Sequence, residues 1–337
     1  MTKELENKEI NMGFGVIDEI PSMKLYDYEA VCGSSASTTE YPSKFRLNIE
    51  EMGVGVKSQG LIGACVACAT STALEALILR EVLGKTNGEE ITSEDLNKEL
   101  LGVEEISHWF TYGYCRDDNS TGYGMIPTSC LDHLRNKGTV PMKYFDIPDE
   151  MPSIKTKVKE FPELASIAEK YKLGGYVKFS MKKDEKDNQI KEALMKYRTP
   201  LVCVSPRGFG SVSHCICLVG WDDEKDTYIL KNSWGELNGD KGLLNLDKGK
   251  ITDVFLPLNK EITLPFTDVN KDDWFYSAVR SVNLSGIMTG RTKTEFVPNA
   301  QITRAEVATI VSRLLEKIDE RFENLNKLLE KKGVFEN

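Results

Sequence analysis

The sequence predicts an α+β fold in which a helical half precedes a β-rich half, with a small helical module after them. Three observations lead to this prediction. Small and apolar residues recur at helical spacing over residues 63–84, strand-like segments dominate residues 200–246, and the pattern changes again at Pro265. The 337 residues are enough for two to three domains.

The expected elements follow in order along the chain. The long central helix over 63–84 is followed by a shorter helix over 94–101, for which either Thr92 or Ser93 can be the N-cap. The remaining expected segments are a polar loop at 114–124, helices near 127–136, 161–171 and 188–197, and strands at 175–179, 200–204, 214–221, 228–230 and 242–246.

The composition is that of a globular protein that does not bind nucleic acid or cross a membrane. Hydrophobic residues make up 40% of the chain, and its net charge of −9 opposes binding to nucleic acid or to anionic lipid. The sequence contains no apolar run of the ~18 residues that a membrane span requires. The first residues carry scattered charges without an apolar core, which does not match a secretory signal peptide.

A cysteine lies where the central helix is expected to begin. At Cys65, the unsatisfied N–H groups and the dipole of a helix N-terminus would favour the thiolate, which is the nucleophilic form of the side chain. Gln59, six residues earlier, carries an amide N–H₂ that can donate to a developing oxyanion. Cys65 and Cys68 could also form a redox pair, but the motifs in the β-rich half favour a nucleophile.

Those motifs supply a histidine and an asparagine. His214 begins an apolar run that ends in Val219-Gly220-Trp221, and a second strand leads into Asn232-Ser233-Trp234-Gly235. His214 follows Cys65 by 149 residues, and Asn232 follows His214 by 18. A cysteine, a histidine and an asparagine in this order and at these distances resemble the papain-like cysteine peptidases.

This resemblance implies a papain-like fold of two subdomains with the active site in the cleft between them. It implies Cys65 as nucleophile, His214 as base, Asn232 as the group that orients the histidine, and Gln59 in the oxyanion hole. It further implies a resting thiolate–imidazolium pair, a shielding role for Trp234, and no metal or organic cofactor.

The resemblance also suggests where substrate binds and how the chain departs from the family. Gly122 and Gly124 stand in the region of the family's glycine-rich substrate loop, with an ordinary loop as the alternative, and Cys215 stands where the family lines its main specificity pocket. Ile62 replaces a cysteine that is usually tied in a disulfide, which indicates a fold independent of oxidation.

After Pro265 the chain resembles one S-layer homology (SLH) repeat. The matching segments include Phe266-Thr267-Asp268-Val269 and Ile302-Thr303-Arg304-Ala305-Glu306. Such repeats bind secondary cell-wall polysaccharide of bacteria, and the resemblance places Trp274, Gly290 and Arg304 at positions associated with that ligand. An arginine suits an anionic sugar because its fork donates two parallel hydrogen bonds.

The tail is predicted to be a helix that could form a coiled coil. Its apolar residues step by three and four positions: Val307, Val311, Leu314, Ile318, Phe322, Leu325 and Leu329. Because the SLH family commonly uses three copies, a single copy suggests a homo-oligomer, specifically a trimer. A helix that packs on its own chain is the alternative.

These observations predict four regions: an N-terminal extension (1–40), a papain-like peptidase domain (41–262), a single SLH repeat (263–316) and a C-terminal helix (317–337). The extension lacks a charged helical repeat and is short for an inhibitory propeptide, so it is expected to pack on the peptidase domain.

The predicted function is that of a cysteine endopeptidase that hydrolyses peptide bonds through a thioester at Cys65 and carries a module for wall polysaccharide. The alternative is a catalytically inactive papain-like scaffold that acts in wall binding or assembly. If exported, the protein is expected at the cell surface or in the cell wall; the lack of a signal peptide in this chain leaves a cytoplasmic or phage-associated location as alternatives.

Overall fold

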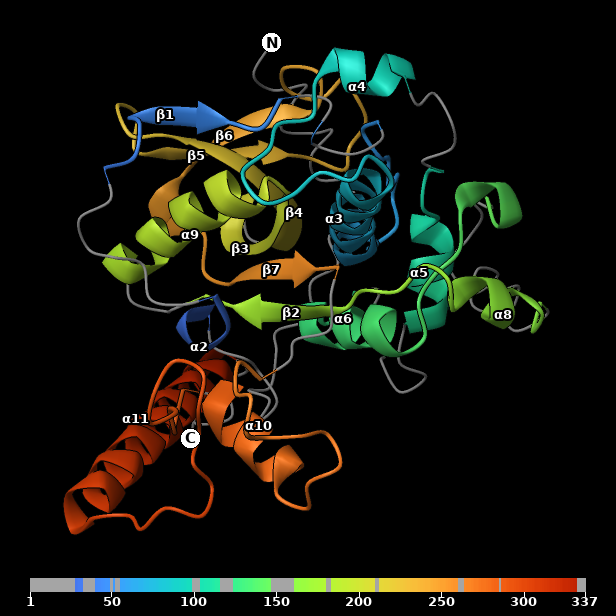
Figure 1. Cartoon of the computed structure of the whole chain (residues 1–337). Coiled ribbons are helices and arrows are strands. Elements are labelled where there is room, and N and C mark those ends of the chain that lie inside the picture. Colours follow the sequence, from blue (N-terminus) through green and yellow to red (C-terminus); the bar gives the residue numbers. More distant parts are fainter. Residues whose placement is uncertain are drawn as a thin grey trace. The chain divides into compact units, whose positions relative to one another are not determined.

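The computed structural model (Figure 1) divides into two compact units. Unit 1 comprises residues 1–17 and 37–261, and unit 2 comprises residues 18–36 and 262–337. The structure describes residues 28–32, 40–48, 51, 55–98, 104–115, 124–146, 161–179, 183–209, 212–259, 264–284 and 286–331. Most of the predicted extension 1–40 lies outside the described residues, and so does Gly122.

The helical half of unit 1 is built around α3 (Cys65–Val82), which agrees with the predicted central helix. Most of α3 is buried, and small residues such as Ala69 and Ala73 allow close packing on several sides of the helix. The chain leaves the helix through Gly84, whose φ of +62° is a left-handed conformation that glycine adopts readily. The other helices of this half are α4 (Ser93–Lys98), α5 (His108–Cys115) and α6 (Pro127–Asn136).

The N-cap of α4 is Thr92. Its hydroxyl accepts from the Asp95 N–H at 3.3 Å, and the Asp95 carboxylate accepts from the Thr92 N–H at 2.8 Å. This reciprocal pair satisfies two backbone donors at the start of the helix. It decides between the two N-cap residues that the sequence left open.

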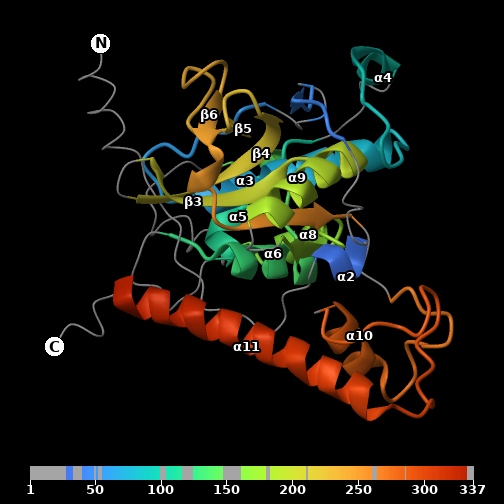
Figure 2. The same ribbon diagram turned by 90° about the vertical axis from the view of Figure 1, so that its left-hand side faces the viewer.

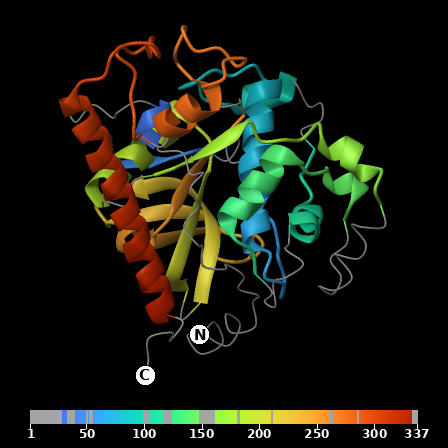
Figure 3. The same cartoon turned by 90° about the horizontal axis from the view of Figure 1, so that it is seen from below.

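The β-rich half is an antiparallel sheet, seven-stranded among the described residues. Its order is β2-β7-β3-β4-β5-β6, and β1 pairs with β4. The strands are β1 (Lys44–Arg46), β2 (Gly175–Lys178), β3 (Leu201–Phe209), β4 (Val212–Asp222), β5 (Thr227–Lys231), β6 (Leu243–Asp247) and β7 (Val254–Leu258). Seen from below, the strands lie on one side of α3 and the green helices on the other (Figure 3). This arrangement is the predicted combination of a helical half and a β-rich half.

The long strand β4 organises this sheet. It pairs with β3, β5 and β1, and its register to β5 shifts between Leu218 and Gly220. A Cβ atom at Gly220 would lie 2.3 Å from the Phe45 carbonyl oxygen and 2.8 Å from the Arg46 Cα. Only a glycine at this position lets β1 approach, which explains the glycine before Trp221.

Two further helices differ in length from their predictions. The helix expected over 161–171 is only α8 (Leu164–Ala168), and the helix expected over 188–197 is the longer α9 (Lys183–Tyr197). α9 packs on β4 (Figure 2). Short 3₁₀ turns, η2 (Met142–Tyr144) and η3 (Lys248–Lys250), complete the described part of unit 1.

Unit 2 contains α2 (Tyr28–Cys32), α10 (Tyr276–Leu284) and α11 (Arg304–Lys331), and α2 packs on α10. Its core is small. One cluster of buried apolar side chains among its described residues comprises Phe266, Val269 and Val279, and partly buried neighbours pack around them. A short segment from the N-terminal region thus belongs to the same unit as the C-terminal module.

The helix α11 begins with a reciprocal cap. The Thr303 hydroxyl accepts from the Glu306 N–H at 3.2 Å, and the Glu306 carboxylate accepts from the Thr303 N–H at 2.7 Å. The helix continues without interruption to Lys331 (Figure 2), so the predicted boundary between 316 and 317 falls inside it. None of the helices in the described ranges is long and apolar enough to span a bilayer.

Candidate active site

Cys65 is the first residue of α3, as the sequence predicted. Ala64, which precedes it, has no side chain that can cap the helix, and its N–H donates instead to the Ile62 carbonyl at 2.8 Å. No capping side chain therefore offsets the positive end of the helix dipole at the sulfur. This position suits a nucleophilic thiolate.

His214 lies near the start of β4, and its Nε2 is 3.0 Å from Asn232 Oδ1. The same oxygen accepts from the Ser233 N–H at 2.8 Å, while Asn232 Nδ2 donates to Asn238 Oδ1 at 3.1 Å. These contacts determine which atom of the amide faces the ring. Because an amide oxygen can only accept, Nε2 of a neutral His214 carries the proton, and Nδ1 is the basic nitrogen.

The imidazole of His214 lies in surroundings that disfavour its charged form. Burial lowers the pKa of His214 to about 4, although the hydrogen bond with Asn232 acts in the opposite direction. The ring is therefore able to accept a proton from a neighbouring thiol. The resting ion pair between Cys65 and His214 that the resemblance implies stays a prediction, because the causes of this shift are burial and Asn232 alone.

Two aromatic side chains enclose the imidazole. The Trp234 ring stacks on His214 with centroids 4.9 Å apart and planes at 26°. Phe209, at the end of β3, meets His214 edge-on at 4.9 Å and Trp234 edge-on at 5.4 Å. Apolar rings around a hydrogen bond exclude water and strengthen it. This geometry is consistent with the shielding role predicted for Trp234.

Gln59 is held in place by the residue that follows Asn232. Gln59 Oε1 accepts from Ser233 Oγ at 2.6 Å, and the Gln59 N–H donates to the Ser233 carbonyl at 2.9 Å. Gln59 Nε2 donates to the Ile62 carbonyl at 2.9 Å. An amide nitrogen carries two N–H groups, so this bond alone does not exhaust its capacity to donate.

A buried ion pair supports this loop. Lys57 Nζ lies 2.7 Å from Glu75 Oε1 on α3 and donates to the Ile106 carbonyl at 3.0 Å, while the Ile106 N–H donates to the same Glu75 oxygen at 2.6 Å. Glu105 Oε1 lies 3.3 Å from Lys57 Nζ. Burial opposes the charge on Lys57, but Glu75 and Glu105 outweigh it and raise the pKa of the ammonium above its usual value.

The packing of α3 against β4 brings the two halves of the site together. Cys217 Sγ on β4 donates to the Ala69 carbonyl on α3 at 3.2 Å. Cys65 lies one turn before Ala69, and it acts electrostatically on the Cys215 thiol, the neighbour of His214 on β4. Cys65, His214 and Gln59 have no exposed surface in this arrangement.

The other thiols near the site are held protonated by their surroundings. Burial is the main cause that raises the pKa of four of them above the ordinary value, namely Cys68, Cys203, Cys215 and Cys217. None of these four begins a helix. Cys65 is equally buried, and its place at the start of α3 distinguishes it from these four.

The predicted substrate residues are only partly described. Gly124 and Cys215 are both buried, and Gly122 lies outside the described residues. Cys215 pairs with Val204 in the sheet and has no exposed surface. The role of these positions in specificity remains a prediction.

The predicted polysaccharide residues lie in unit 2. Trp274 is 92% exposed, and Arg304, the first residue of α11, is also exposed. Gly290 is enclosed, since a Cβ atom there would lie 2.4 Å from Phe266 Cε1 and 2.6 Å from the Thr292 carbonyl oxygen. The first two can touch a ligand, whereas the glycine allows close packing of the loop.

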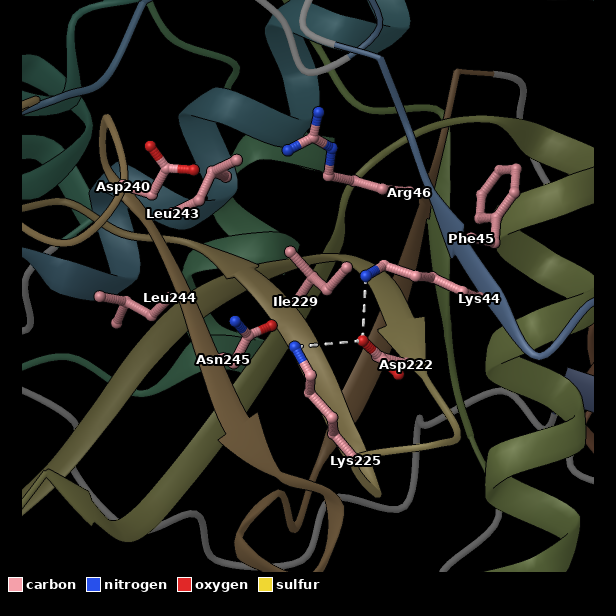
Figure 4. Close-up of a pocket in the computed structure, with 10 residues that line it drawn as sticks. All are labelled: Lys44, Phe45, Arg46, Asp222, Lys225, Ile229, Asp240, Leu243, Leu244 and Asn245. Carbon is pink, nitrogen blue, oxygen red and sulfur yellow. Dashed lines mark ion pairs between the residues drawn. The ribbon is translucent and has the colours of Figure 1, made fainter.

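A cavity of about 550 Å³ lies elsewhere in unit 1, between β1 and β6 (Figure 4). Lys44 and Lys225 extend toward the same carboxylate of Asp222, at 3.1 and 3.7 Å, and apolar side chains such as Leu244 line the wall. None of the catalytic candidates lines it. In the described ranges, no three histidine, cysteine or acidic side chains gather as a metal site would require.

Several residues of the site could not be identified from the sequence. Phe209, Lys57 and Asn238 carried no motif signal that would place them at the site. The two remaining histidines lie in the helical half: His108 is buried at the start of α5, and His133 is half-buried in α6. His108 and His133 belong to the packing of the helical half.

Comparison with known proteins identifies two regions of this chain. The family model described as papain family cysteine protease matches residues 156–259, and the model of the S-layer homology domain matches residues 265–308. These matches agree with the two resemblances found in the sequence.

Two curated proteins are similar to parts of the chain. Over 81 residues the chain is 36% identical to the Surface-layer 125 kDa protein of Lysinibacillus sphaericus. The aligned segment covers 23% of this chain and 7% of that protein. Over 202 residues the chain is 22% identical to Cysteine proteinase 2 of Entamoeba histolytica. This second alignment covers 57% of this chain and 59% of that protein. The chain therefore spans less than two thirds of either relative.

Solved structures of cysteine proteases share the fold. The crystal structure of xylellain, a cysteine protease from Xylella fastidiosa, aligns with a TM-score of 0.55 at 19% identity and covers 75% of this chain and 97% of that one. Digestive procathepsin L2 of Tenebrio molitor aligns with a TM-score of 0.51 at 17% identity and covers 77% and 80%. Unit 1 therefore has the predicted papain-like fold.

Proposed function

We propose that this chain, which joins a papain-like cysteine protease domain to an S-layer homology domain, is a cysteine endopeptidase that hydrolyses peptide bonds. One observation carries the proposal. The His214–Asn232 hydrogen bond, enclosed by Trp234, leaves the basic nitrogen of the histidine for a thiol, and β4 packs on the helix that begins with Cys65. An inactive scaffold would have no need to retain this arrangement.

In the proposed reaction, Cys65 attacks the carbonyl carbon of the substrate and its proton passes to Nδ1 of His214. Asn232 Oδ1 accepts from the Nε2–H throughout and so keeps the ring in the tautomer that can act as a base. Because burial disfavours the imidazolium, the proton is expected to move as the sulfur attacks. His214 then donates this proton to the leaving amine, and water hydrolyses the thioester.

The negative charge that develops on the substrate oxygen needs donors. We assign this role to the Gln59 side chain and the backbone N–H of Cys65, since Ser233 holds Gln59 close to the start of α3. One such donor is worth about 2.7–4 kcal/mol of barrier in a comparable site. Gln59→Ala is therefore expected to lower kcat by about 10²–10³-fold.

The direct test uses a fluorogenic peptide library in reducing buffer. Ser233→Ala, which removes the hydroxyl that holds Gln59, is expected to lower kcat less than Gln59→Ala does. Ser166→Ala is a matched control, because Ser166 is an exposed serine of α8. Equal rates for Gln59→Ala and the control would exclude Gln59 from the oxyanion hole.

The SLH domain is proposed to bind secondary cell-wall polysaccharide and so to hold the protein at the cell surface. The exposure of Trp274 and Arg304 supports this, because an aromatic face and a guanidinium fork can contact a sugar ring and its anionic substituent. Sedimentation with purified walls tests the proposal. Trp274→Ala or Arg304→Ala should leave the protein in the supernatant, whereas Arg313→Ala, elsewhere on α11, should not.

We also propose that α11 mediates self-association, with a trimer as the expected state. Apolar side chains on this helix are exposed, namely Val307, Val311, Leu314, Leu315 and Phe322. Val307, Val311 and Leu314 follow the four- and three-residue steps of a coiled-coil seam, Phe322 lies eight residues on, and Leu315 lies beside the seam. Analytical ultracentrifugation should yield the mass of three chains for the intact protein and of one chain for Phe322→Asp. A single chain mass for the intact protein at high concentration would refute this proposal.

A further inference from the structure

Two cysteines outside the active site face each other in the helical half of unit 1. Cys115 is the last residue of α5, and Cys130 lies within α6. Their sulfur atoms are 3.9 Å apart, and both thiols are reduced in this structure. Neither residue contributes to the proposed peptide hydrolysis.

The surrounding contacts hold the two sulfurs at this distance. Thr70 Oγ1 on α3 lies 3.3 Å from Cys130 Sγ and fixes the direction of that side chain. Beside it, Tyr114 on α5 meets His133 on α6 edge-on at 4.5 Å, which ties the end of one helix to the other. The proximity of the sulfurs thus results from packing on both sides.

We propose that Cys115 and Cys130 form a reversible intramolecular disulfide. A disulfide needs a sulfur separation of about 2.05 Å, so the atoms must approach by about 1.9 Å. Cys115 can supply this movement because it is the last residue of α5, where the helix's own carbonyl groups lack intrahelical partners. Cys130 is fully buried, so Cys115, which is half-buried, is the thiol that an oxidant reaches.

The oxidant in this proposal is a small disulfide such as oxidised glutathione. The Cys115 thiolate attacks one sulfur of that disulfide, whose S–S bond breaks and releases one thiol with a proton from solution. Cys130 then loses its proton and attacks the Cys115 sulfur, which forms the protein disulfide and releases the second thiol. In total, two protein thiols and one small disulfide become one protein disulfide and two small thiols.

The surroundings set the rate of this exchange. Burial, together with the neighbouring Cys130, raises the pKa of the Cys115 thiol well above its usual range. Little thiolate is therefore present at neutral pH, and the rate should rise by about tenfold for each pH unit. The reaction is accordingly slow at pH 7 and faster in mildly alkaline solution.

The disulfide would close a ring around residues 116–129, which include Gly122 and Gly124. Neither this bond nor its test depends on the proposed peptidase function.

Peptide mapping tests the proposal on the full chain. Trypsin cuts after Lys98, Arg116 and Arg135, so Cys115 and Cys130 fall on separate peptides that each contain one cysteine. The protein is incubated with oxidised glutathione at pH 8, alkylated and digested without reduction. The expected product is peptide 99–116 linked to peptide 117–135, and reduction should separate the pair.

Two variants control the assignment. Cys130→Ser should leave Cys115 as a mixed disulfide with glutathione, whereas Cys203→Ser, which alters a buried thiol of β3, should retain the link. Alkylation of both Cys115 and Cys130 after prolonged oxidation would overturn the proposal. Glutathione that remains on Cys115 of the unaltered chain, or a link that forms only in urea, would overturn it as well.

Discussion

The buried pair of Lys57 and Glu75 lends itself to a quantitative prediction. In Lys57→Met the ammonium is lost, and the Glu75 carboxylate keeps the Ile106 N–H as a donor at 2.6 Å. A buried charge that loses its partner costs about 3–5 kcal/mol. Since a domain is typically stable by about 5–15 kcal/mol, this variant should lose a large part of its free energy of unfolding.

The double variant Lys57→Met/Glu75→Leu gives the prediction its sharper form. It removes both charges, so the desolvation of an unpaired carboxylate no longer opposes folding. The Ile106 N–H then lacks its acceptor, which costs about 1–3 kcal/mol. The double variant should consequently be more stable than Lys57→Met alone, although it carries one more substitution.

Urea unfolding followed by circular dichroism measures these differences. Lys85→Met is the matched control, because Lys85 pairs with Asp95 at 2.8 Å but remains partly exposed, where such a pair is worth about 0–1 kcal/mol. A loss for Lys57→Met no larger than for Lys85→Met would refute the reasoning. A double variant less stable than Lys57→Met would do the same.

Three further predictions concern acid stability, the orientation of the catalytic base and oxidation. Burial lowers the pKa of His214 to about 4 and that of His108 to about 3, whereas the pKa of an unfolded histidine is about 6.5. The unfolded state therefore binds protons first, and the free energy of unfolding falls as pH drops from about 6.5 toward 4. For His214 this loss is about 3 kcal/mol, and unfolding midpoints that do not change between pH 7 and pH 4.5 would contradict it. Asn232→Ala should lower kcat by on the order of 10²-fold with little change in KM, because a poorly oriented base transfers the proton less efficiently. Steady-state kinetics measure this, and an unchanged kcat would contradict it. Oxidation of Cys115 and Cys130 closes a ring of the chain, which should raise the free energy of unfolding by about 3 kcal/mol. The melting temperature measured by calorimetry should therefore rise by about 6–12 °C. A lower melting temperature in the oxidised form would count against a well-fitted bond.

Local motifs made much of the site predictable. The run of small and apolar residues after Gly63 predicts the helix that starts at Cys65. The apolar runs before Gly220-Trp221 and Asn232-Ser233 predict β4 and β5. The same holds for α11, whose cap pairs Thr303 with Glu306. In each case, neighbouring residues alone determine the structure.

Elements that depend on distant partners were missed. β7 contains Pro257, which argues against a strand with partners on both sides, yet β7 lies between β2 and β3. α5 is rich in aromatic residues and contains Gly113, a composition with low helix propensity, and its burial overrides this.

The supporting residues of the site were missed for a similar reason. The hydrogen bond from Ser233 to Gln59 joins positions 174 residues apart in the chain. Phe209 reaches His214 because the pairing of β3 with β4 shifts register between Ser205 and Phe209. Neither the contact nor the shift is encoded by local spacing.

The measurement that tests the central claim most directly is hydrolysis of a peptide library at neutral pH in reducing buffer by the intact chain and by Cys65→Ala. We expect cleavage by the intact chain and none by the variant, because the sulfur at the start of α3 is the proposed nucleophile. Equal cleavage by both proteins, or no cleavage by the intact chain, would contradict it.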